Sequence, residues 1–154
     1  MRRLGLLIAV IATVVVATAC TPLTTHVHIL ASDAYQGRNN ATPASVLAQN
    51  YIIYQFKNIG ATGLETSKSG DDTFRQTFTD GTNIVGIIPG TELPNEYVIV
   101  GGHYDHLGSG CRGSGPPDSV CNGATDNAAG TAAAIDVGRA FPTFPARPPR
   151  SRVL

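Results

Sequence analysis

The chain has 154 residues, of which 42% are hydrophobic and 14% are charged, a composition that excludes a mainly disordered polypeptide. This length fits one domain or part of one. Lys and Arg together number 11 and balance 11 Asp and Glu, with no basic stripe, which argues against a nucleic-acid partner.

The N-terminal residues are typical of a targeting segment. A pair of arginines precedes an apolar run from Leu4 to Val16, which is short for a membrane span. The run leads into the string ATAC at residues 17–20, which resembles a bacterial lipobox. We expect residues 1–19 to be a lipoprotein signal peptide and Cys20 to be lipidated, so that a lipid anchor holds the chain at the membrane of the bacterial cell envelope. An ordinary signal peptide, which would give a secreted or periplasmic protein, and an uncleaved anchor are the alternatives.

Export bears on the other two cysteines, Cys111 and Cys121, which flank a loop rich in Gly and Pro. In an oxidising compartment such a pair is expected to form a disulfide. Closing so short a loop would stabilise the fold by roughly 2–3 kcal/mol. The alternative is a thiolate metal site, although no second Cys or His lies at ligand spacing beside either residue.

Helical patterns occur in two stretches of the first half of the chain. We predict a short helix over Thr24–Ser32 and a longer one over about Pro43–Ile59. Thr42 suits the N-cap of the longer helix, Pro43 its first position and Gly60 its end. Five apolar residues recur at helical spacing on it and are predicted to face the core: Val46, Leu47, Tyr51, Tyr54 and Ile59.

The remainder is predicted to alternate between strands and one further helix. After a loop over Gly60–Asp72 we expect, in chain order, strands over Phe74–Phe78, Asn83–Ile88 and Tyr97–Gly102, a helix from Asn127 to about Phe141, and a strand beginning at Ser151. The continuous apolar run of the third strand predicts burial on both of its faces. This alternation favours an α/β sheet covered on both sides.

Candidate metal ligands follow the strand Tyr97–Gly102. His103 lies at its carboxyl end, where open α/β sheets bind ligands, and a neutral imidazole there can ligate zinc. Asp105 points to the same side in extended chain and can accept the other N–H of that imidazole. Asp126 lies at a predicted helix N-terminus, where the helix dipole favours a carboxylate, and its two oxygens can bridge two metal ions.

These residues also have simpler structural interpretations. A lone histidine after a strand is often a hydrogen-bonded surface or core residue, and Asp126 fits a plain N-cap equally well. His106 is either a further ligand or a neighbour that shapes the cleft. His26 and His28 lie on the first predicted helix and are expected to be structural or exposed. Tyr104 is expected to pack beside the site.

Taken in order, the strings NIVGIIPG, EYVIVGGHYDHLG and NGATDNAAG closely resemble the zinc-dependent M28 family of metallopeptidases, which includes bacterial aminopeptidases. The earlier string LASDAYQGR, followed by a helix ending in YQFKNIGA, is similar to the N-terminal part of that family's catalytic domain. The resemblance spans about residues 27–154. It implies that residues 20–154 are the N-terminal portion of such a domain, an incomplete three-layer α/β/α sandwich with a mixed, mostly parallel central sheet.

The resemblance also implies a role for each site residue. His103 matches the first zinc ligand, Asp105 the catalytic-site Asp that orients it, and Asp126 the carboxylate shared by two zinc ions. The peptide bond between Asp126 and Asn127 is often cis in this family. Two zinc ions would activate a water that attacks the carbonyl of a peptide substrate and would stabilise the resulting oxyanion.

The sequence departs from the family pattern after Asp126. The family's Glu-Glu pair, a later acidic ligand and a second His are absent from these residues. We therefore expect a truncated product or an incomplete gene model that is inactive as given and poorly stable alone. The alternatives are a non-catalytic envelope lipoprotein that binds a peptide or a single metal, and a glutaminyl-cyclase-like zinc enzyme.

Overall fold

The computed structural model describes residues 23–111, 119–141 and 150–154. The expected signal peptide at residues 1–19 and the lipidated Cys20 lie outside these ranges. Within them, no helix combines the length and apolar character needed to cross a membrane.

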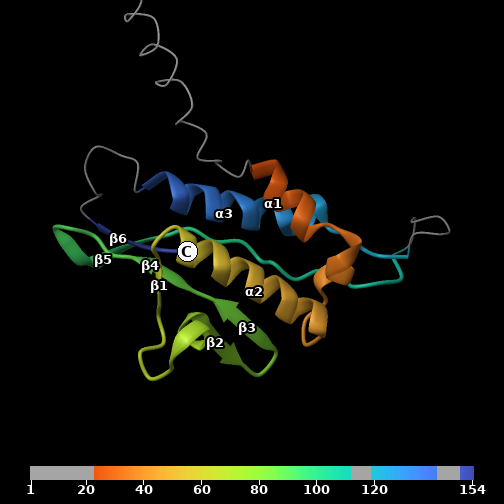
Figure 1. The fold of residues 1–154 in the computed structure, drawn as a ribbon, viewed down its shortest axis with the longest axis horizontal. Coiled ribbons are helices and arrows are strands. Elements are labelled where there is room, and N and C mark those ends of the chain that lie inside the picture. The colour runs from red at the N-terminus through yellow and green to blue at the C-terminus, as the bar shows by residue number, and fades with distance from the viewer. Residues whose placement is uncertain (1–22, 112–118, 142–149) are drawn as a thin grey trace, which may run out of the picture.

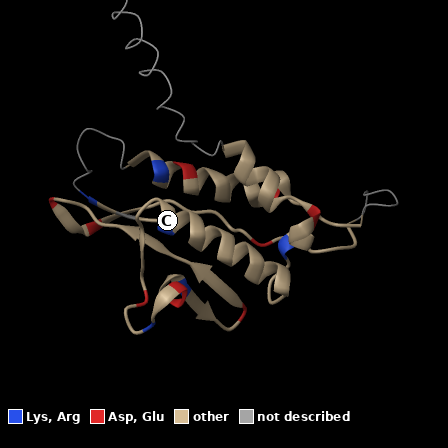
Figure 2. Ribbon diagram, viewed as in Figure 1, with Lys and Arg blue, Asp and Glu red and all other residues tan. Residues whose placement is uncertain are grey.

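Three α-helices pack together in the described part of the chain. They are α1 (Leu23–Leu30), α2 (Pro43–Asn58) and α3 (Ala129–Ala140), and α1 lies beside α3 in Figure 1. The 3₁₀ segment η2 (Asp33–Arg38) connects α1 to α2, and a π-helical turn, η4 (Ala124–Ala128), precedes α3. Figure 2 shows few charged residues on these helices: α1 has no Lys, Arg, Asp or Glu, and α2 has only Lys57 near its end.

The ends predicted for the longer helix are confirmed. The Thr42 side chain accepts a hydrogen bond of 3.3 Å from the backbone N–H of Ser45, and Pro43 occupies the first turn. Gly60, just past the helix, has a φ of 77°, a conformation that glycine adopts at little cost.

The apolar face predicted for this helix is only partly confirmed: Tyr51 and Ile59 are half-buried and pack against buried hydrophobic residues, whereas the other three residues are exposed. Val46, Leu47 and Tyr54 are 49%, 43% and 61% exposed. The buried face is formed instead by a mixture of apolar, small and polar residues: Ser45, Ala48, Gln49, Ile52, Ile53, Gln55 and Phe56. Hydrogen bonds explain part of this pattern, because Gln49 Nε2 donates to Ser45 Oγ at 3.4 Å and Nε of Arg75 donates to Oε1 of Gln49 at 3.3 Å. A polar partner on another element thus draws polar helix residues inward.

Among the described residues, the main sheet has four strands in the order β1-β4-β6-β5. These strands are β1 (Thr62–Gly63), β4 (Gly86–Ile88), β5 (Leu93–Ile99) and β6 (Arg150–Val153). The sheet is mixed, as predicted, but it is not mostly parallel: only β5 and β6 pair in parallel, whereas β1 with β4 and β4 with β6 pair antiparallel. Only the β5–β6 pair is connected through a crossover helix, α3, which is the connection that parallel strands need. The described residues do not establish a three-layer sandwich.

The strand predicted over Asn83–Ile88 is two strands. Its first half lies in β3 (Gly81–Ile84), which pairs with β2 (Arg75–Phe78) in a separate hairpin. Its second half is β4 of the main sheet. Between them the backbone N–H of Val85 bonds the carbonyl of Phe74 at 2.8 Å, so one apolar run serves two sheets. The predicted loop over Gly60–Asp72 in turn contains β1 and the start of a 3₁₀ turn, η3 (Gly70–Phe74).

The expectation that the third predicted strand is buried on both faces is also wrong. This strand is β5, and all seven of its residues are exposed, with Ile99 at 75%. The reason is its place at one end of the sheet, where only β6 pairs with it among the described residues. Pro94 fits such a strand because proline has no N–H to donate to a second neighbour.

Two hydrophobic clusters connect the helices to the sheet and to the candidate site. The larger one joins α2 and α3 to the sheet and contains Ile52, Ile53, Phe56, Ala61, Phe74, Ile135 and Leu154. The smaller one joins Leu30 of α1, Ala48 of α2 and Ala128 of η4. Tyr104 packs against both clusters. The segment that follows β5 is therefore fixed between the helices.

Candidate metal centre

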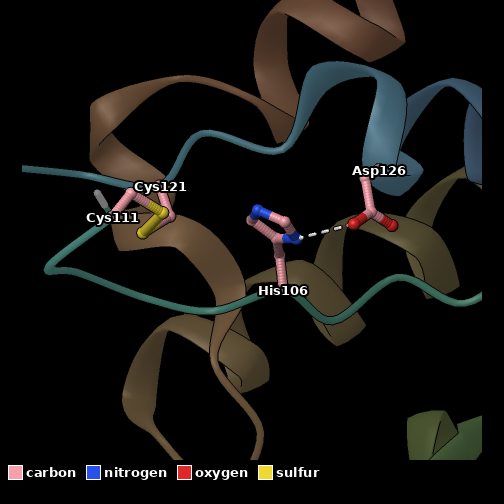
Figure 3. Close-up of a disulfide and its surroundings, with 4 residues drawn as sticks. All are labelled: His106, Cys111, Cys121 and Asp126. Carbon is pink, nitrogen blue, oxygen red and sulfur yellow. Dashed lines mark ion pairs between the residues drawn. A yellow bond between two sulfur atoms is a disulfide. The ribbon is translucent and has the colours of Figure 1, made fainter. Parts of the chain in front are cut away.

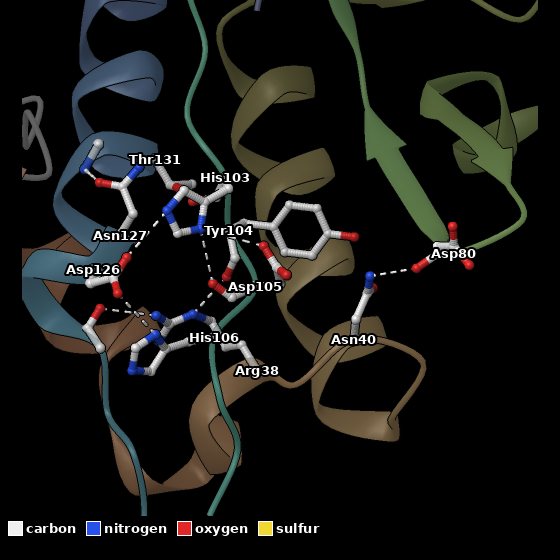
Figure 4. A network of polar contacts seen from close by, with 12 residues as sticks. Arg38, Asn40, Asp80, His103, Tyr104, Asp105, His106, Asp126, Asn127 and Thr131 are labelled. Atoms are coloured by element: carbon white, nitrogen blue, oxygen red, sulfur yellow. Dashed lines mark hydrogen bonds and ion pairs between the residues drawn. The ribbon is translucent and has the colours of Figure 1, made fainter. Parts of the chain in front are cut away.

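His103 and Asp126 face one another across two segments of the chain. The Nε2 atom of His103 lies 3.2 Å from Oδ1 of Asp126, and their side chains are 55% and 67% exposed (Figure 4). Two atoms that share a tetrahedral zinc ion at ordinary bond lengths lie about 3.4 Å apart. An imidazole nitrogen and a carboxylate oxygen therefore stand at the separation of two zinc ligands, on a side open to further ligands. We call this pair the half-site.

The opposite nitrogen of His103 faces Asp105. Its Nδ1 atom lies 3.4 Å from the carboxylate Oδ1 of Asp105 and 3.2 Å from that residue's backbone carbonyl oxygen. The Thr131 hydroxyl of α3 donates a hydrogen bond of 3.0 Å to the backbone carbonyl of His103. If His103 carries its proton on Nδ1, facing Asp105, Nε2 is the lone-pair nitrogen on the side of Asp126.

A tight turn before α3 presents Asp126. Its backbone has φ −126° and ψ 87°, and the Asp126–Asn127 peptide bond is cis. Asp126 is not the N-cap of α3 as the simpler interpretation expected. The neighbouring Asn127 makes the cap-like contact, since its Oδ1 accepts a hydrogen bond of 3.0 Å from the N–H of Gly130. The Asp126 carboxylate is thus left to face the two histidines.

His106 lies on the other side of Asp126. Its Nδ1 atom is 3.6 Å from Oδ2 of Asp126, and its side chain is only 13% exposed. The ring packs against Gly123, where a Cβ atom would come within 2.6 Å of the imidazole. Each carboxylate oxygen of Asp126 is thus paired with a different imidazole, and His106 is the more enclosed of the two.

Cys111 and Cys121 form a disulfide with an S–S distance of 2.00 Å, close to His106 (Figure 3). The backbone beside it is also paired, with Cys121 N–H donating to Gly108 at 2.7 Å and Gly110 N–H donating to Ser119 at 2.9 Å. The bridge closes the connection between the segment of His103 and the turn of Asp126. The loop at residues 112–118 lies outside the described residues.

Residues 83–154 match the family profile described as Peptidase family M28. This part of the chain is an M28 segment. No curated protein matches the chain. The M28 match includes β4, β5, α3 and β6 together with His103, Asp105 and Asp126. Membership of a peptidase family implies metallopeptidase chemistry, with zinc as the general cofactor and peptides as substrates.

The M28 segment alone does not present a complete set of metal ligands. In the ranges that the structure describes, no three His, Cys, Asp or Glu side chains are grouped to hold one metal ion. The donor types and the 3.2 Å separation of the half-site fit zinc, whereas a catalytic zinc generally has three protein ligands and a water. The described residues therefore bring together two candidate ligands, His103 and Asp126, and not the three that such a zinc ion needs.

Arg38 is a component of the site that sequence reasoning missed. It lies on η2, outside the M28 match, and is fully buried. Burial lowers the pKa of its guanidinium, while the carboxylates of Asp105 and Asp126 act in the opposite direction. The one sequence signal that could have indicated it is the Gly37-Arg38 pair within the string LASDAYQGR.

His26 is buried away from the half-site, between the three helices. Its Nδ1 atom lies 2.6 Å from the Tyr51 hydroxyl, and its Nε2 atom lies 2.9 Å from Nη2 of Arg139 and 3.8 Å from Asp136. Burial lowers the pKa of His26, as does Arg139, whereas Asp136 raises it. His28 is exposed on the same helix. Neither histidine contributes to the half-site.

Proposed function

We propose that this chain carries the first part of the metal centre of a zinc-dependent aminopeptidase that cleaves peptide bonds through two zinc ions. The observation that supports this proposal most directly is the 3.2 Å separation between Nε2 of His103 and Oδ1 of Asp126 within a segment of Peptidase family M28. In this assignment His103 would hold one zinc ion, and Asp126 would be a ligand shared by both ions.

The chain's own residues prepare the half-site for a cation. Asp105 keeps the proton of His103 on Nδ1, so that Nε2 remains a lone-pair donor. The two oxygens of Asp126 point in different directions, toward His103 and toward His106, which suits a bridging carboxylate. Zinc bound there would polarise a substrate carbonyl and lower the pKa of a water molecule. His106 supports Asp126 from its enclosed side.

We further propose that these residues by themselves lack peptidase activity and bind at most one zinc ion. The described residues group fewer than three candidate ligands, whereas catalytic zinc needs three from the protein. The same observation favours the second candidate function, a non-catalytic protein that binds a single metal or a peptide at this half-site.

The deciding experiment is a zinc titration of the purified chain with its first 19 residues removed. Wild type, His103→Ala and Asp126→Ala are compared, with His28→Ala as a matched control because His28 is exposed on α1. We expect close to one zinc per chain in wild type and in the control, and loss of that zinc in the two half-site variants. Equal zinc in all four proteins, or none in wild type, would refute the proposed half-site.

A peptidase assay on the same zinc-loaded samples separates the two candidate functions. Release of p-nitroaniline from an aminoacyl p-nitroanilide by wild type but not by Asp126→Ala would establish catalysis by this chain. Zinc binding without turnover would support the single-metal binding function.

The cellular location is a separate proposal that rests on the sequence of residues 1–20. We propose an envelope protein anchored through a lipid on Cys20. Labelling of cells with a radioactive fatty acid should mark the wild-type protein and leave Cys20→Ala unlabelled. Equal labelling of the two proteins would contradict the anchor.

A further inference from the structure

We propose that Arg38 is a positioning residue of the metal centre, whose guanidinium joins the two chain segments that carry His103 and Asp126 and holds them at ligand separation. For its metal readout this inference depends on the proposed zinc function. Its geometric part is independent of metal.

The hydrogen bonds of Arg38 reach both segments at once (Figure 4). Nε donates to the backbone carbonyl of Tyr104 at 2.7 Å, in the segment that follows β5. Nη1 donates to the carbonyl of Asn122 at 2.8 Å and Nη2 to that of Gly123 at 3.0 Å, in the segment that leads to Asp126. Tyr104 lies between His103 and Asp105 in sequence. One planar group therefore bonds the backbone beside both residues of the half-site.

The same guanidinium is tied to the first helix. Nη1 also donates to the carbonyl of Leu30, the last residue of α1, and Leu30 itself is fully buried. Because Leu30 packs in a core cluster with Ala48 and Ala128, this anchor is rigid. Arg38 therefore connects both site segments to the same buried end of α1.

The local backbone of η2 directs Arg38 inward. Gln36, Gly37 and Arg38 all have positive φ, at 43°, 64° and 50°. The carbonyl of Gly37 accepts from the N–H of Gly108 at 3.0 Å, and that of Arg38 accepts from the N–H of His106 at 3.2 Å. A Cβ at position 37 would collide with the carbonyls of Gly108 and Cys121, so the turn lies directly against the site segments.

A guanidinium suits this role better than an ammonium. Arg has five donors in a fixed plane and can serve several carbonyls at once, whereas Lys has a single charged nitrogen on a flexible stem. The carboxylates of Asp105 and Asp126 in turn favour the charged form of the Arg38 guanidinium, against the effect of its burial. Loss of the planar group should let the two segments separate, although each would retain its own backbone bonds.

The test compares Arg38→Lys and Arg38→Met with wild type, and uses Arg139→Lys as a matched control. Arg139 also hydrogen-bonds in a partly buried network, with His26 and Gln55, but that network lies away from the half-site. Two quantities are measured: amide hydrogen exchange in the metal-free chain, and the Kd for Co²⁺ with its visible absorption spectrum.

Two amides report on the site segments: His106, bonded to the carbonyl of Arg38, and Ala128, bonded to the carbonyl of Gly123 at 3.1 Å. In both Arg38 variants we expect these amides to exchange about tenfold faster or more, while interior α2 amides such as Ile53 stay near wild type. We expect the Kd for Co²⁺ to rise about 10–100-fold with an altered spectrum. Arg139→Lys should leave the Kd and the two reporter amides unchanged.

Each outcome of this comparison decides the proposal. Unchanged reporter amides, a uniform loss of protection over the whole chain, or unfolding of both Arg38 variants would assign Arg38 to general stability and overturn it. Wild-type Co²⁺ affinity in the Arg38 variants would also overturn it while leaving the proposed zinc function intact. Selective loss of protection in a chain that binds no Co²⁺ would uphold the positioning role and reject the zinc function.

Discussion

Nε2 of His103 lies 3.2 Å from Oδ1 of Asp126, although one residue follows β5 and the other belongs to the turn before α3. Neither atom is enclosed, so the contact is not a consequence of close packing in a core. It follows from three groups behind the pair, namely Asp105, Thr131 and Arg38, which fix the side chain of His103 or the backbone on either side. The first prediction concerns the group that faces His103 directly.

Replacing Asp105 with Asn should weaken zinc binding by about 10–100-fold, because the imidazole loses the carboxylate that holds its proton on Nδ1. The fold should be little affected, since the Asp105 side chain is 44% exposed. Competition of the chain against a chromophoric chelator measures the affinity. Asp136→Asn serves as the control, because Asp136 lies 3.8 Å from a different histidine, His26, away from the half-site. Unchanged zinc affinity in Asp105→Asn would argue against an orienting role.

Local chemistry allowed some features of the fold to be predicted from sequence. The ends of α2 followed from Thr42, Pro43 and Gly60, whose preferences depend on the backbone beside them. The buried face of α2 depended instead on a residue distant in sequence, Arg75, whose Nε donates to Oε1 of Gln49 at 3.3 Å. The spacing of apolar residues does not reveal polar partners on other elements. For this reason the prediction that Val46 and Tyr54 face the core was wrong.

The candidate site shows the same division. His103, Asp105 and Asp126 could be selected because their residue types belong to metal chemistry and lie within recognisable strings. Arg38 could not, because its partners are backbone carbonyls, which every residue possesses and no motif marks. The exposure of β5 was missed for a related reason: a run of apolar residues does not tell whether a strand lies at the centre or the edge of a sheet.

The disulfide provides a second prediction. Reduction, or the double change of Cys111 and Cys121 to Ser, should lower the free energy of unfolding by roughly 2–3 kcal/mol, since the unfolded chain regains the freedom of the closed loop. Urea unfolding with and without a reductant measures the difference. The double Ser variant is the control, because a reductant should not destabilise it further. Equal stability of oxidised and reduced wild type would contradict the prediction.

Gly130 offers a third test through the turn that presents Asp126. A Cβ at this position would meet the Asn127 side chain, including its Cγ at 2.7 Å, while Asn127 accepts the Gly130 N–H. We expect Gly130→Ala to destabilise the fold by about 1–3 kcal/mol and to weaken zinc binding. Gly101→Ala is the matched control, since a Cβ there has no atom within 4 Å. Thermal unfolding and zinc titration are measured for both variants. Equal stability and equal zinc affinity of Gly130→Ala and Gly101→Ala would count against this packing argument.

The exposed strand β5 leads to a fourth prediction. Ile99 and Tyr97 are 75% and 55% exposed on a strand at the end of the sheet, an arrangement that favours pairing between molecules. Ile99→Lys should therefore raise the monomer fraction seen by sedimentation velocity. Leu107→Lys is the control, because Leu107 is 65% exposed but lies outside the strand. Equal effects of the two substitutions would assign self-association to general hydrophobicity instead of to the sheet edge.

The last prediction is an acid sensitivity carried by His26. Arg139 Nη2 donates toward Nε2 of this ring at 2.9 Å, so the neutral imidazole must carry its proton on Nδ1, facing the Tyr51 hydroxyl. Protonation of Nε2 would place its N–H opposite the N–H of Arg139 and the imidazolium charge beside the guanidinium charge. The Asp136 carboxylate, 3.8 Å from Nε2, would offset only part of this repulsion. The Gln55 side chain already accepts from Arg139, and the Tyr51 pKa of about 12 keeps its hydroxyl neutral.

The direction of the effect follows from the lowered pKa of His26. Its ordinary value is 6.5, so below that pH the unfolded chain binds more protons than the folded chain. The stabilisation from neutral His26 is therefore complete above pH 6.5 and is lost as the pH falls from there through the folded-state pKa. Urea midpoints of wild type should fall over this interval more steeply than those of His26→Gln, whereas the control His28→Gln should follow wild type. Parallel curves for wild type and His26→Gln would exclude His26 as the source of acid sensitivity.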